Sequence, residues 1–342
     1  PVLAGLGPAA VRDLISFLKY GGAETQLADR RQYVKRAIGF GTSQSGRFLR
    51  TFLYYGFNQD ERGRQVFDGV WAHVAGAGRG SFNHRFAQAS RDGHPHLNTF
   101  YPTDIFPFTD AAQTDPETGL TDGLLARAKA IPKVFYTNGS YEYWGRAASL
   151  IHTAIDGRRD VEPPKDTRIY FITGSQHGPG AFPPSKQNER YLRNPNDFRP
   201  LMRALLVALN NWIANGKEPP ASRYPRIDRG ELVALESVKF PKISGVAFPV
   251  RMHRAWRADY GPEFRAKGIV AYEPPRVGSA FPVLVPQVDA GGNEIAGVRL
   301  PHVAVPLGVY AGWNLRTDAI GAPEELYSMA GSFFPFTRAQ AA

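Results

Sequence analysis

Residues 36–53 read RAIGFGTSQSGRFLRTFL. Residues 36–40 have the composition of a short buried strand, and they run directly into a turn of glycine, serine and threonine at 41–46. Beyond the turn, apolar side chains recur three and four residues apart, which is the spacing of a helix packed on one face (Phe48, Leu49, Phe52 and Leu53). The stretch therefore predicts a strand, a sharp turn and a helix in immediate succession.

The turn places Ser43 where a serine could act as a nucleophile. A serine hydroxyl attacks only when a base removes its proton and backbone N–H groups hold the developing oxyanion. A tight turn would lift Ser43 above the edge of the sheet, with the positive N-terminus of the helix aimed at that charge and the amide of Gln44 as an oxyanion donor. The usual pattern is G-x-S-x-G, and here Ser45 replaces its last glycine. An ordinary Gly/Ser turn or a helix cap is the alternative.

Strands and helices alternate up to about residue 221, which predicts an α/β fold with a mostly parallel sheet flanked by helices. The expected strands cover 36–40, 67–77, 132–137 and 167–173. The expected helices cover 8–20, the segment after the turn, the region around 147–155, and 198–215. In the first helix the expected packed face consists of Val11, Leu14, Ile15 and Leu18.

Two regions lack this alternation. Residues 79–130 carry many aromatic side chains among Pro, Asp and His, and such a long connection predicts a lid or a pocket wall. From about residue 222, Pro and Gly break the chain into short apolar runs, which predicts an irregular, β-rich region with a hairpin turn at 289–293. We therefore expect a core domain over 1–221, which includes the lid region, and a C-terminal extension over 222–342 packed on that core.

A serine nucleophile on such a turn needs an acid and a histidine base, and their usual order along the chain is serine, acid, histidine. His177 follows the last expected strand, where this order places the base. Glu142 follows the strand before it, where a carboxylate would fix the imidazole tautomer and stabilise the imidazolium. The alternatives are a histidine that stabilises its own loop and a surface carboxylate paired with Arg146.

Further side chains near these positions are candidates for the substrate pocket. Tyr141, Tyr143 and Trp144 surround the expected acid, and they would either shape an acyl or alcohol pocket or belong to the core. Arg85, in a second polar cluster at 83–86, would either hold a carboxylate of the substrate or form a structural salt bridge.

The remaining histidines do not indicate a metal site. His73 lies inside an expected strand, which favours a core role. His94 and His96 have a spacing that metal ligands use, but no carboxylate follows at a recognisable interval. We expect no metal and no cofactor.

Composition excludes several classes of function. The chain has no cysteine, so disulfides, thiolate metal sites and a cysteine nucleophile are excluded. The net charge of +10 comes from scattered basic residues without a basic run, so we expect no nucleic-acid binding. No apolar stretch is long enough to span a bilayer, which predicts a soluble protein. The chain opens on Pro1, so we expect either that an export leader has been removed or that the chain is a fragment. Compartment and oligomeric state are not predicted.

With these residues in view, the sequence resembles a bacterial family described as "alpha/beta hydrolase domain" proteins. The resemblance runs nearly from end to end, through Ala10–Asp13, Gly41–Arg50, Ala72–Gly76, Phe82–Phe86, Glu142–Trp144, Gln176–His177 and Gly331–Phe336. It implies an α/β-hydrolase fold and esterase-type chemistry with Ser43, Glu142 and His177 in the catalytic roles. It indicates little about the substrate.

One departure from that pattern concerns the start of the sheet. In such hydrolases several strands precede the nucleophile turn, and the loop after the third supplies a second oxyanion donor. Here one helix alone precedes the turn strand, so we expect the N-terminal strands and that donor to be missing or supplied by a separate chain.

These observations lead to three hypotheses. The first is a serine esterase that cleaves a small-molecule carboxylic ester through an acyl-enzyme. The second keeps the same three residues but acts as an amidase, peptidase or acyltransferase. The third is an incomplete, inactive hydrolase fragment.

Overall fold

The central feature of the fold is a sheet of four parallel strands. The computed structural model describes residues 6–21, 34–80, 82 and 104–337. The strands pair in the order β1-β2-β5-β6. They are β1 (Ile38–Thr42), β2 (Gly69–His73), β5 (Lys133–Gly139) and β6 (Thr167–Ile172). All four strands expected from the sequence are therefore confirmed, and their carboxyl ends lie at one edge of the sheet.

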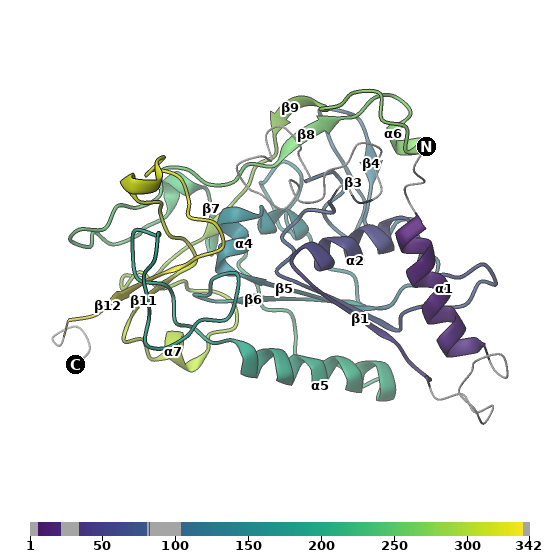
Figure 1. Ribbon diagram of the computed structural model, residues 1–342, viewed down its shortest axis with the longest axis horizontal. Helices are drawn as coiled ribbons and strands as arrows, with labels where there is room; N and C mark the ends of the chain where they lie inside the picture. Colours follow the sequence, from purple (N-terminus) through teal and green to yellow (C-terminus); the bar gives the residue numbers. More distant parts are fainter. Residues whose placement is uncertain (1–5, 22–33, 81, 83–103, 338–342) are drawn as a thin grey trace.

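Helices cover both faces of this sheet. Helix α2 (Gln44–Tyr54) lies above it and α5 (Arg199–Asn215) lies below it in Figure 1. Alternate strand residues supply the two cores, because successive side chains of a strand point to opposite faces. The α5 side contains Trp71, Phe135, Tyr170, Leu205, Leu209 and Trp212. The larger cluster includes Phe52 and Leu53 of α2 with Val70, Val134 and Phe171.

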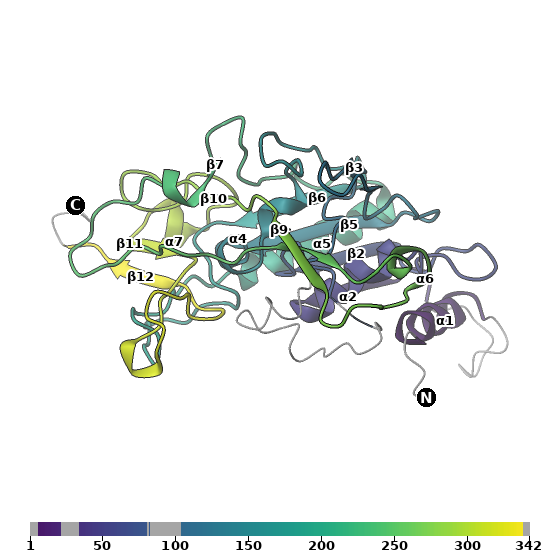
Figure 2. The same ribbon diagram turned by 90° about the horizontal axis from the view of Figure 1, so that it is seen from above.

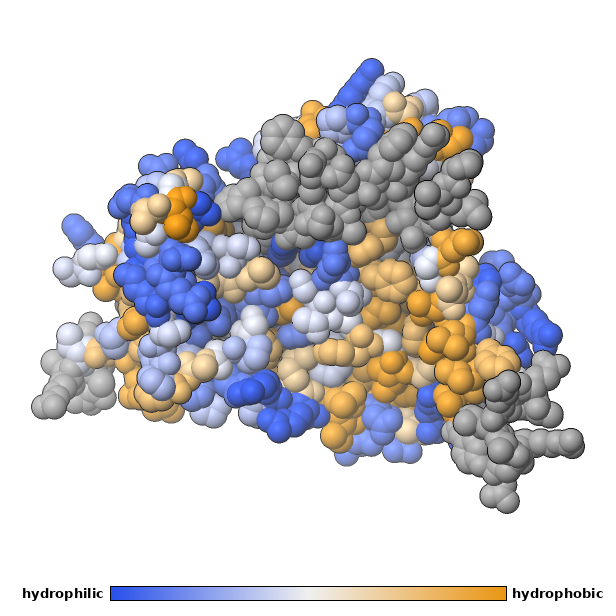
Figure 3. Space-filling model, viewed as in Figure 1, coloured by the Kyte–Doolittle hydropathy of each residue, from blue (hydrophilic) through white to orange (hydrophobic). Residues whose placement is uncertain are grey.

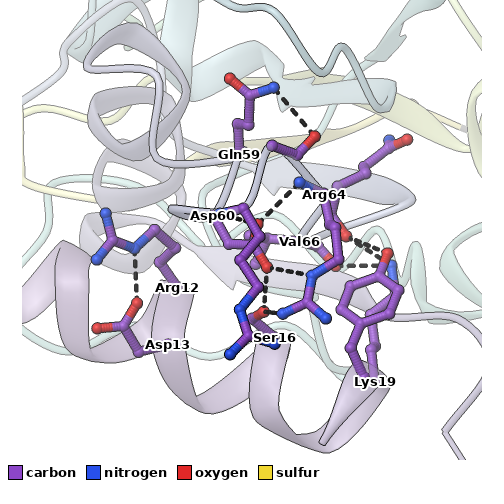
Figure 4. A network of polar contacts seen from close by, with 12 residues as sticks. Arg12, Asp13, Ser16, Lys19, Gln59, Asp60, Arg64 and Val66 are labelled. Atoms are coloured by element: carbon purple, nitrogen blue, oxygen red, sulfur yellow. Dashed lines mark hydrogen bonds and ion pairs between the residues drawn. The ribbon is translucent and has the colours of Figure 1, made fainter.

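Helix α1 (Leu6–Tyr20) contacts the rest of the chain both through Val11 and Ile15, which pack against the larger core cluster, and through buried polar groups. The ammonium group of Lys19 is buried and donates to the carbonyls of Gln65 at 2.9 Å and Val66 at 3.0 Å. Ser16 hydrogen-bonds to the carboxylate of Asp60, and Figure 4 shows this network. The expected apolar face is wrong at Leu14, which is 57% exposed. The buried face of the helix differs from the expected one because Ser16 and Lys19 are buried against residues 60–66, where their polar groups find hydrogen-bond partners.

The segment after β5 also differs from expectation. Instead of a helix around 147–155, the chain forms the short helix α4 (Ser140–Gly145) and then the 3-10 helix η3 (Ala148–Ile151). Between them Ala147 has a φ of 51°, in the left-handed region, which interrupts a continuous helix. Sequence periodicity does not reveal such a break.

The region 79–130 is described in part, and residues 81 and 83–103 lie outside the described residues. Phe106 and Phe108 are buried in the larger core cluster, so they contribute to the core. The hairpin of β3 (Gln113–Thr114) and β4 (Thr121–Asp122) follows. The lid or pocket wall expected over 79–130 stays a prediction.

Residues after 221 form short elements that join the same core. The strands are β7 (Leu232–Val233), β8 (Trp256–Asp259), β9 (Arg276–Ala280), β10 (Val285–Pro286), β11 (Gly308–Ala311) and β12 (Ser332–Pro335). The helices are α6 (Phe264–Lys267) and α7 (Pro301–Ala304), with 3-10 helices η4 (Leu235–Ser237) and η5 (Asp318–Ile320). Seen from above, β8 and β9 cross the side of the sheet that carries α2 (Figure 2). The expected irregular, β-rich C-terminal region is confirmed.

Two parts of this C-terminal region run beside β6. Isolated parallel bridges join Tyr170 to Arg223 and Ile172 to Val298. The expected turn at 289–293 is present, since the amide of Asp289 donates to the carbonyl of Asn293 at 2.8 Å. Because Tyr224, Phe281 and Val283 also belong to the larger core cluster, the division at residue 221 stays a prediction.

At the other side of the sheet, β1 is the outer strand. In the part of the chain that the structure describes, it pairs with β2 alone. Its Phe40 is 54% exposed, and Leu14 and Phe17 of α1 are also exposed apolar residues. Figure 3 shows apolar side chains gathered on this side of the molecule. Among the described residues, no helix has the length and apolar character needed to cross a bilayer.

Candidate active site

Ser43 occupies the single residue between β1 and α2. Its backbone has a φ of 57° and a ψ of −116°, which is a strained conformation for a residue with a Cβ. Its amide donates to the carbonyl of His73 at 2.8 Å, and its carbonyl accepts from the amide of Arg47 at 3.0 Å. The turn is thus fixed on one side to β2 and on the other to the first turn of α2.

Two glycines allow the chain to fold this tightly. A Cβ on Gly41 would lie 2.4 Å from the carbonyl oxygen of Ser45, and one on Gly46 would lie 3.0 Å from the carbonyl oxygen of Gly41. Ser45 itself is exposed. The close approach that the last glycine of G-x-S-x-G permits falls here on Gly46, which explains why a serine is tolerated at position 45.

Glu142 is held at the carboxyl end of β5 by the start of α4. Its side chain is fully buried, and its Oε2 accepts a hydrogen bond of 2.7 Å from the amide of Gly139. This bond closes the first turn of the helix onto the end of the strand. The remaining oxygen, Oε1, therefore has a fixed direction.

His177 contacts this second oxygen of Glu142. Its Nδ1 lies 2.6 Å from Oε1 of Glu142, and the ring packs edge-on against Tyr141 with centroids 5.9 Å apart. An ionised carboxylate only accepts hydrogen bonds, so Nδ1 is the donor. In the neutral ring Nε2 is then the free base, and the His177 side chain is 13% exposed.

Ser43 and His177 lie at the same edge of the sheet. His73, which pairs with Thr42 just before Ser43, has its pKa lowered to about 3 by burial and by the nearby charge of His177. Within the described residues, no hydrogen bond joins the Ser43 hydroxyl to His177. Nucleophile and base are often farther apart than a hydrogen bond in ligand-free sites and come together when substrate binds.

Comparison with known proteins identifies the family. A family model described as "Alpha/beta hydrolase domain" matches residues 4–342. The chain belongs to this alpha/beta hydrolase family. Neither a comparison with curated proteins nor one with solved structures gave a match. Family membership supports hydrolase activity and agrees with the parallel sheet and its flanking helices.

The expected oxyanion donor of this alpha/beta hydrolase is at the N-terminus of α2. Gln44 is the first residue of that helix, where the amides have no acceptor within the helix itself. The helix dipole favours negative charge at this point. The place of Gln44 is therefore compatible with the role that the sequence predicts, which stays a prediction.

The four expected pocket residues differ in their surroundings. Tyr141 contacts the ring of His177. Tyr143 belongs to the larger core cluster, and its hydroxyl lies 2.8 Å from Nε2 of His152. The ring of Trp144 packs against Trp313 and other apolar residues of the C-terminal region. These contacts favour the core alternative for Tyr143 and Trp144. The expected role of Arg85 lies outside the described residues, as do His94 and His96.

Sequence reasoning missed Glu294, which contacts both the segment that carries Glu142 and the segment that carries His177. Its Oε2 accepts from the amide of Gly174 at 2.7 Å, and Oε1 accepts from the hydroxyl of Ser140. Burial raises the pKa of Glu294 to about 7. A lone carboxylate among Gly, Asn and Ile in a turn-rich region carries no local signal of this position.

Among the residues that the structure describes, no group of three or more His, Asp or Glu side chains could hold a metal ion. The structure places a hydroxyl (Ser43), an imidazole (His177) and a carboxylate (Glu142) at one edge of the sheet.

Proposed function

We propose that this alpha/beta hydrolase cleaves carboxylic esters with Ser43 as nucleophile, His177 as base and Glu142 as orienting acid. The observation that carries the proposal is the 2.6 Å contact between His177 Nδ1 and the fully buried Glu142. The strained backbone of Ser43 at the end of the neighbouring strand supports it, because strain of this kind concentrates at functional residues.

The proposed reaction has two halves. Ser43 Oγ attacks the ester carbonyl while Nε2 of His177 takes the hydroxyl proton, and the tetrahedral oxyanion forms near the amide of Gln44. Collapse expels the alkoxide, which receives the proton from His177 and leaves as the alcohol. Water then attacks the acyl-enzyme with His177 as base again, and the carboxylic acid departs from regenerated Ser43.

Glu142 contributes to both halves without exchanging a proton. It keeps the Nδ1 proton on the side away from substrate, so that Nε2 faces the nucleophile, and its negative charge stabilises the imidazolium. Its second oxygen is bound to the amide of Gly139, which prevents the carboxylate from rotating away.

The test uses a fluorophosphonate probe, which labels activated serines, on the wild type, Ser43→Ala and Ser45→Ala. The two serines share one turn, and Ser45 is exposed, so the second variant is a matched control. We expect Ser43→Ala to lose labelling and to lower kcat for a p-nitrophenyl ester by about 10⁴-fold or more, with Ser45→Ala near wild type.

Equal labelling of the wild type and Ser43→Ala would refute the nucleophile. The same preparation, assayed with an ester and an amide that share one acyl group, tests the substrate class. Turnover of the amide at a rate similar to that of the ester would assign an amidase instead.

A further inference from the structure

Glu294 is a buried acid outside the proposed catalytic residues, and its hydrogen-bond donors belong to the two segments that carry Glu142 and His177. Its side chain is 4% exposed. Oε1 accepts from the hydroxyl of Ser140, and Oε2 accepts from the amide of Gly174 at 2.7 Å. Within the described residues no Lys, Arg or His forms an ion pair with Glu294.

The two donors lie close in sequence to the acid and the base. Ser140 is the first residue of α4 and precedes Glu142 by two residues. Gly174 follows β6 and opens the loop that reaches His177, with a φ of 58° that favours glycine. One carboxyl group therefore bridges the segment that carries the acid and the segment that carries the base.

Other groups fix the His177 loop from further sides. Side-chain amides of Asn194 and Asn196 donate to the carbonyl of Gly174 at 2.9 and 3.0 Å. The amide of Gly331 donates to the side-chain oxygen of Gln176 at 3.1 Å. Both polar groups of the Gly174 backbone are thus bound. Glu294 connects this loop to α4, in addition to the amide of Tyr141, which donates to the carbonyl of Ser175 at 3.2 Å, and to the Glu142–His177 contact.

Ser140 is also held in place by the C-terminal region. A Cβ on Gly312 would lie 1.9 Å from the Ser140 hydroxyl oxygen, so the chain after β11 packs directly on it. Ser140 is fully buried and cannot turn its hydroxyl to solvent. The bridge from Glu294 therefore has little freedom at either end.

A buried carboxyl group without a cationic partner costs stability, and an apolar residue of similar size would fill the same space at lower cost. We propose that Glu294 is a positioning residue for the catalytic pair: by binding Ser140 and Gly174 together, it sets the distance between Glu142 and His177. This inference rests on the proposed function, since it assigns a role within that same site.

Four variants test it. Glu294→Ala removes both bonds, and Ser140→Ala removes one. Glu294→Gln restores part of the bridge, because its amide oxygen can accept from Gly174 and its NH₂ can donate to Ser140. Glu189→Gln is the matched control, since Glu189 is also fully buried but binds Arg193 and the amide of Gln187.

We expect Glu294→Ala to lower kcat for the ester by about 10- to 100-fold with KM within about twofold, as for residues that orient a catalytic group. Ser140→Ala and Glu294→Gln should fall between that variant and wild type, and Glu189→Gln should keep the wild-type kcat. If Glu294→Ala does not fold, the order of Glu294→Gln and Ser140→Ala against Glu189→Gln decides. The proposal would be overturned if folded Glu294→Ala kept the wild-type kcat, or if Glu294→Gln and Ser140→Ala both kept it.

A second readout does not depend on turnover. The proton between His177 Nδ1 and Glu142 should give a far-downfield proton NMR resonance, assigned by its loss in His177→Asn. We expect it to broaden or move upfield in Glu294→Ala and Ser140→Ala and to stay unchanged in Glu189→Gln. An unchanged resonance in Glu294→Ala would also overturn the inference. Failure of the proposed function appears elsewhere, as labelling that persists in Ser43→Ala.

Discussion

At the scale of single residues, Glu142 uses each carboxylate oxygen for a different task. Oε2 is bound to the amide of Gly139 at 2.7 Å, and Oε1 is bound to Nδ1 of His177 at 2.6 Å. Both partners are donors, so both oxygens must be acceptors. An amide in place of the carboxylate has one acceptor and one donor, and it cannot satisfy the two partners at once.

Glu142→Gln should therefore lower kcat by about 10³- to 10⁴-fold, because His177 would adopt the wrong tautomer or lose its orientation. KM should change little, since Glu142 does not touch the substrate in the proposed reaction. Steady-state kinetics on a p-nitrophenyl ester provide the measurement. Asp156→Asn is the control, because Asp156 is an exposed acid in the following segment. A kcat for Glu142→Gln within about tenfold of wild type would exclude Glu142 as the acid.

Residues differ in how far the sequence predicts their place. The position of Glu142 beside His177 can be expected because the carboxyl ends of parallel strands meet at one edge, and each residue follows such a strand. Glu294 cannot be expected in this way. It reaches the site from a turn far along the chain, and only the packing of the C-terminal region against β6 brings it there.

At the scale of elements, the turn between β1 and α2 depends on a close approach of two backbone segments. The carbonyl oxygen of Ser45 lies so near Gly41 that no Cβ fits between them. Gly39, two residues earlier on the same strand, faces the flexible end of Leu49, where a Cβ would lie 3.2 Å from Cδ2. The two glycines therefore form a natural pair for comparison.

Gly41→Ala should shift the turn and displace Ser43, which lowers kcat by about 100-fold, since a displacement of about 1 Å can have that effect. It should also lower the free energy of unfolding by about 1–3 kcal/mol through overpacking. Gly39→Ala should keep kcat within about threefold of wild type, because the contact with Leu49 needs to relax by only a few tenths of an ångström and does not involve the backbone of the turn. Ester kinetics and urea denaturation of both variants measure these effects. Equal kcat values for the two variants would contradict the role assigned to the turn.

Regular elements are the part of the fold that local patterns predict best. The four strands and α5 agree with expectation within a few residues, because apolar periodicity reflects burial directly. The packed face of α1 does not, since Ser16 and Lys19 find polar partners in a loop distant in sequence. The break at Ala147 is equally invisible, because the left-handed conformation there depends on tertiary contacts.

At the scale of the whole molecule, the C-terminal region completes both the core and the candidate site. Trp144 of α4 shares an apolar cluster with Trp313 and Val309, and the loop of His177 is bound through Gly331. The sequence predicts that this region consists of short strands and irregular segments. It does not predict the contacts of the region, because short strands separated by Pro and Gly do not show which strands pair. The family match to residues 4–342 treats both regions as one unit.

Three buried titratable groups make the free energy of unfolding depend on pH, two in one direction and one in the other. Burial lowers the pKa values of His73, which also lies near His177, and of His152 to about 3. Burial raises the pKa of Glu294 to about 7. As pH falls from 7 to 5, the unfolded chain binds protons at the two histidines that the folded chain does not bind, which lowers the free energy of unfolding. Over the same range Glu294 takes up its proton in the folded chain before it does so in the unfolded chain, which raises the free energy of unfolding.

Each of these groups should change the free energy of unfolding by about 2 kcal/mol between pH 7 and pH 5. His152→Gln should therefore lose less stability than wild type on acidification over this range, and Glu294→Gln should lose more. The measurement is urea denaturation of the three proteins at pH 5, 6 and 7, with stability compared as slopes against pH. The contribution of Glu294 to the free energy of unfolding is complete below about pH 4.5. The contribution of each histidine continues to grow as the pH falls to about 3. Parallel slopes for all three proteins would mean that these side chains are not buried as the structure describes.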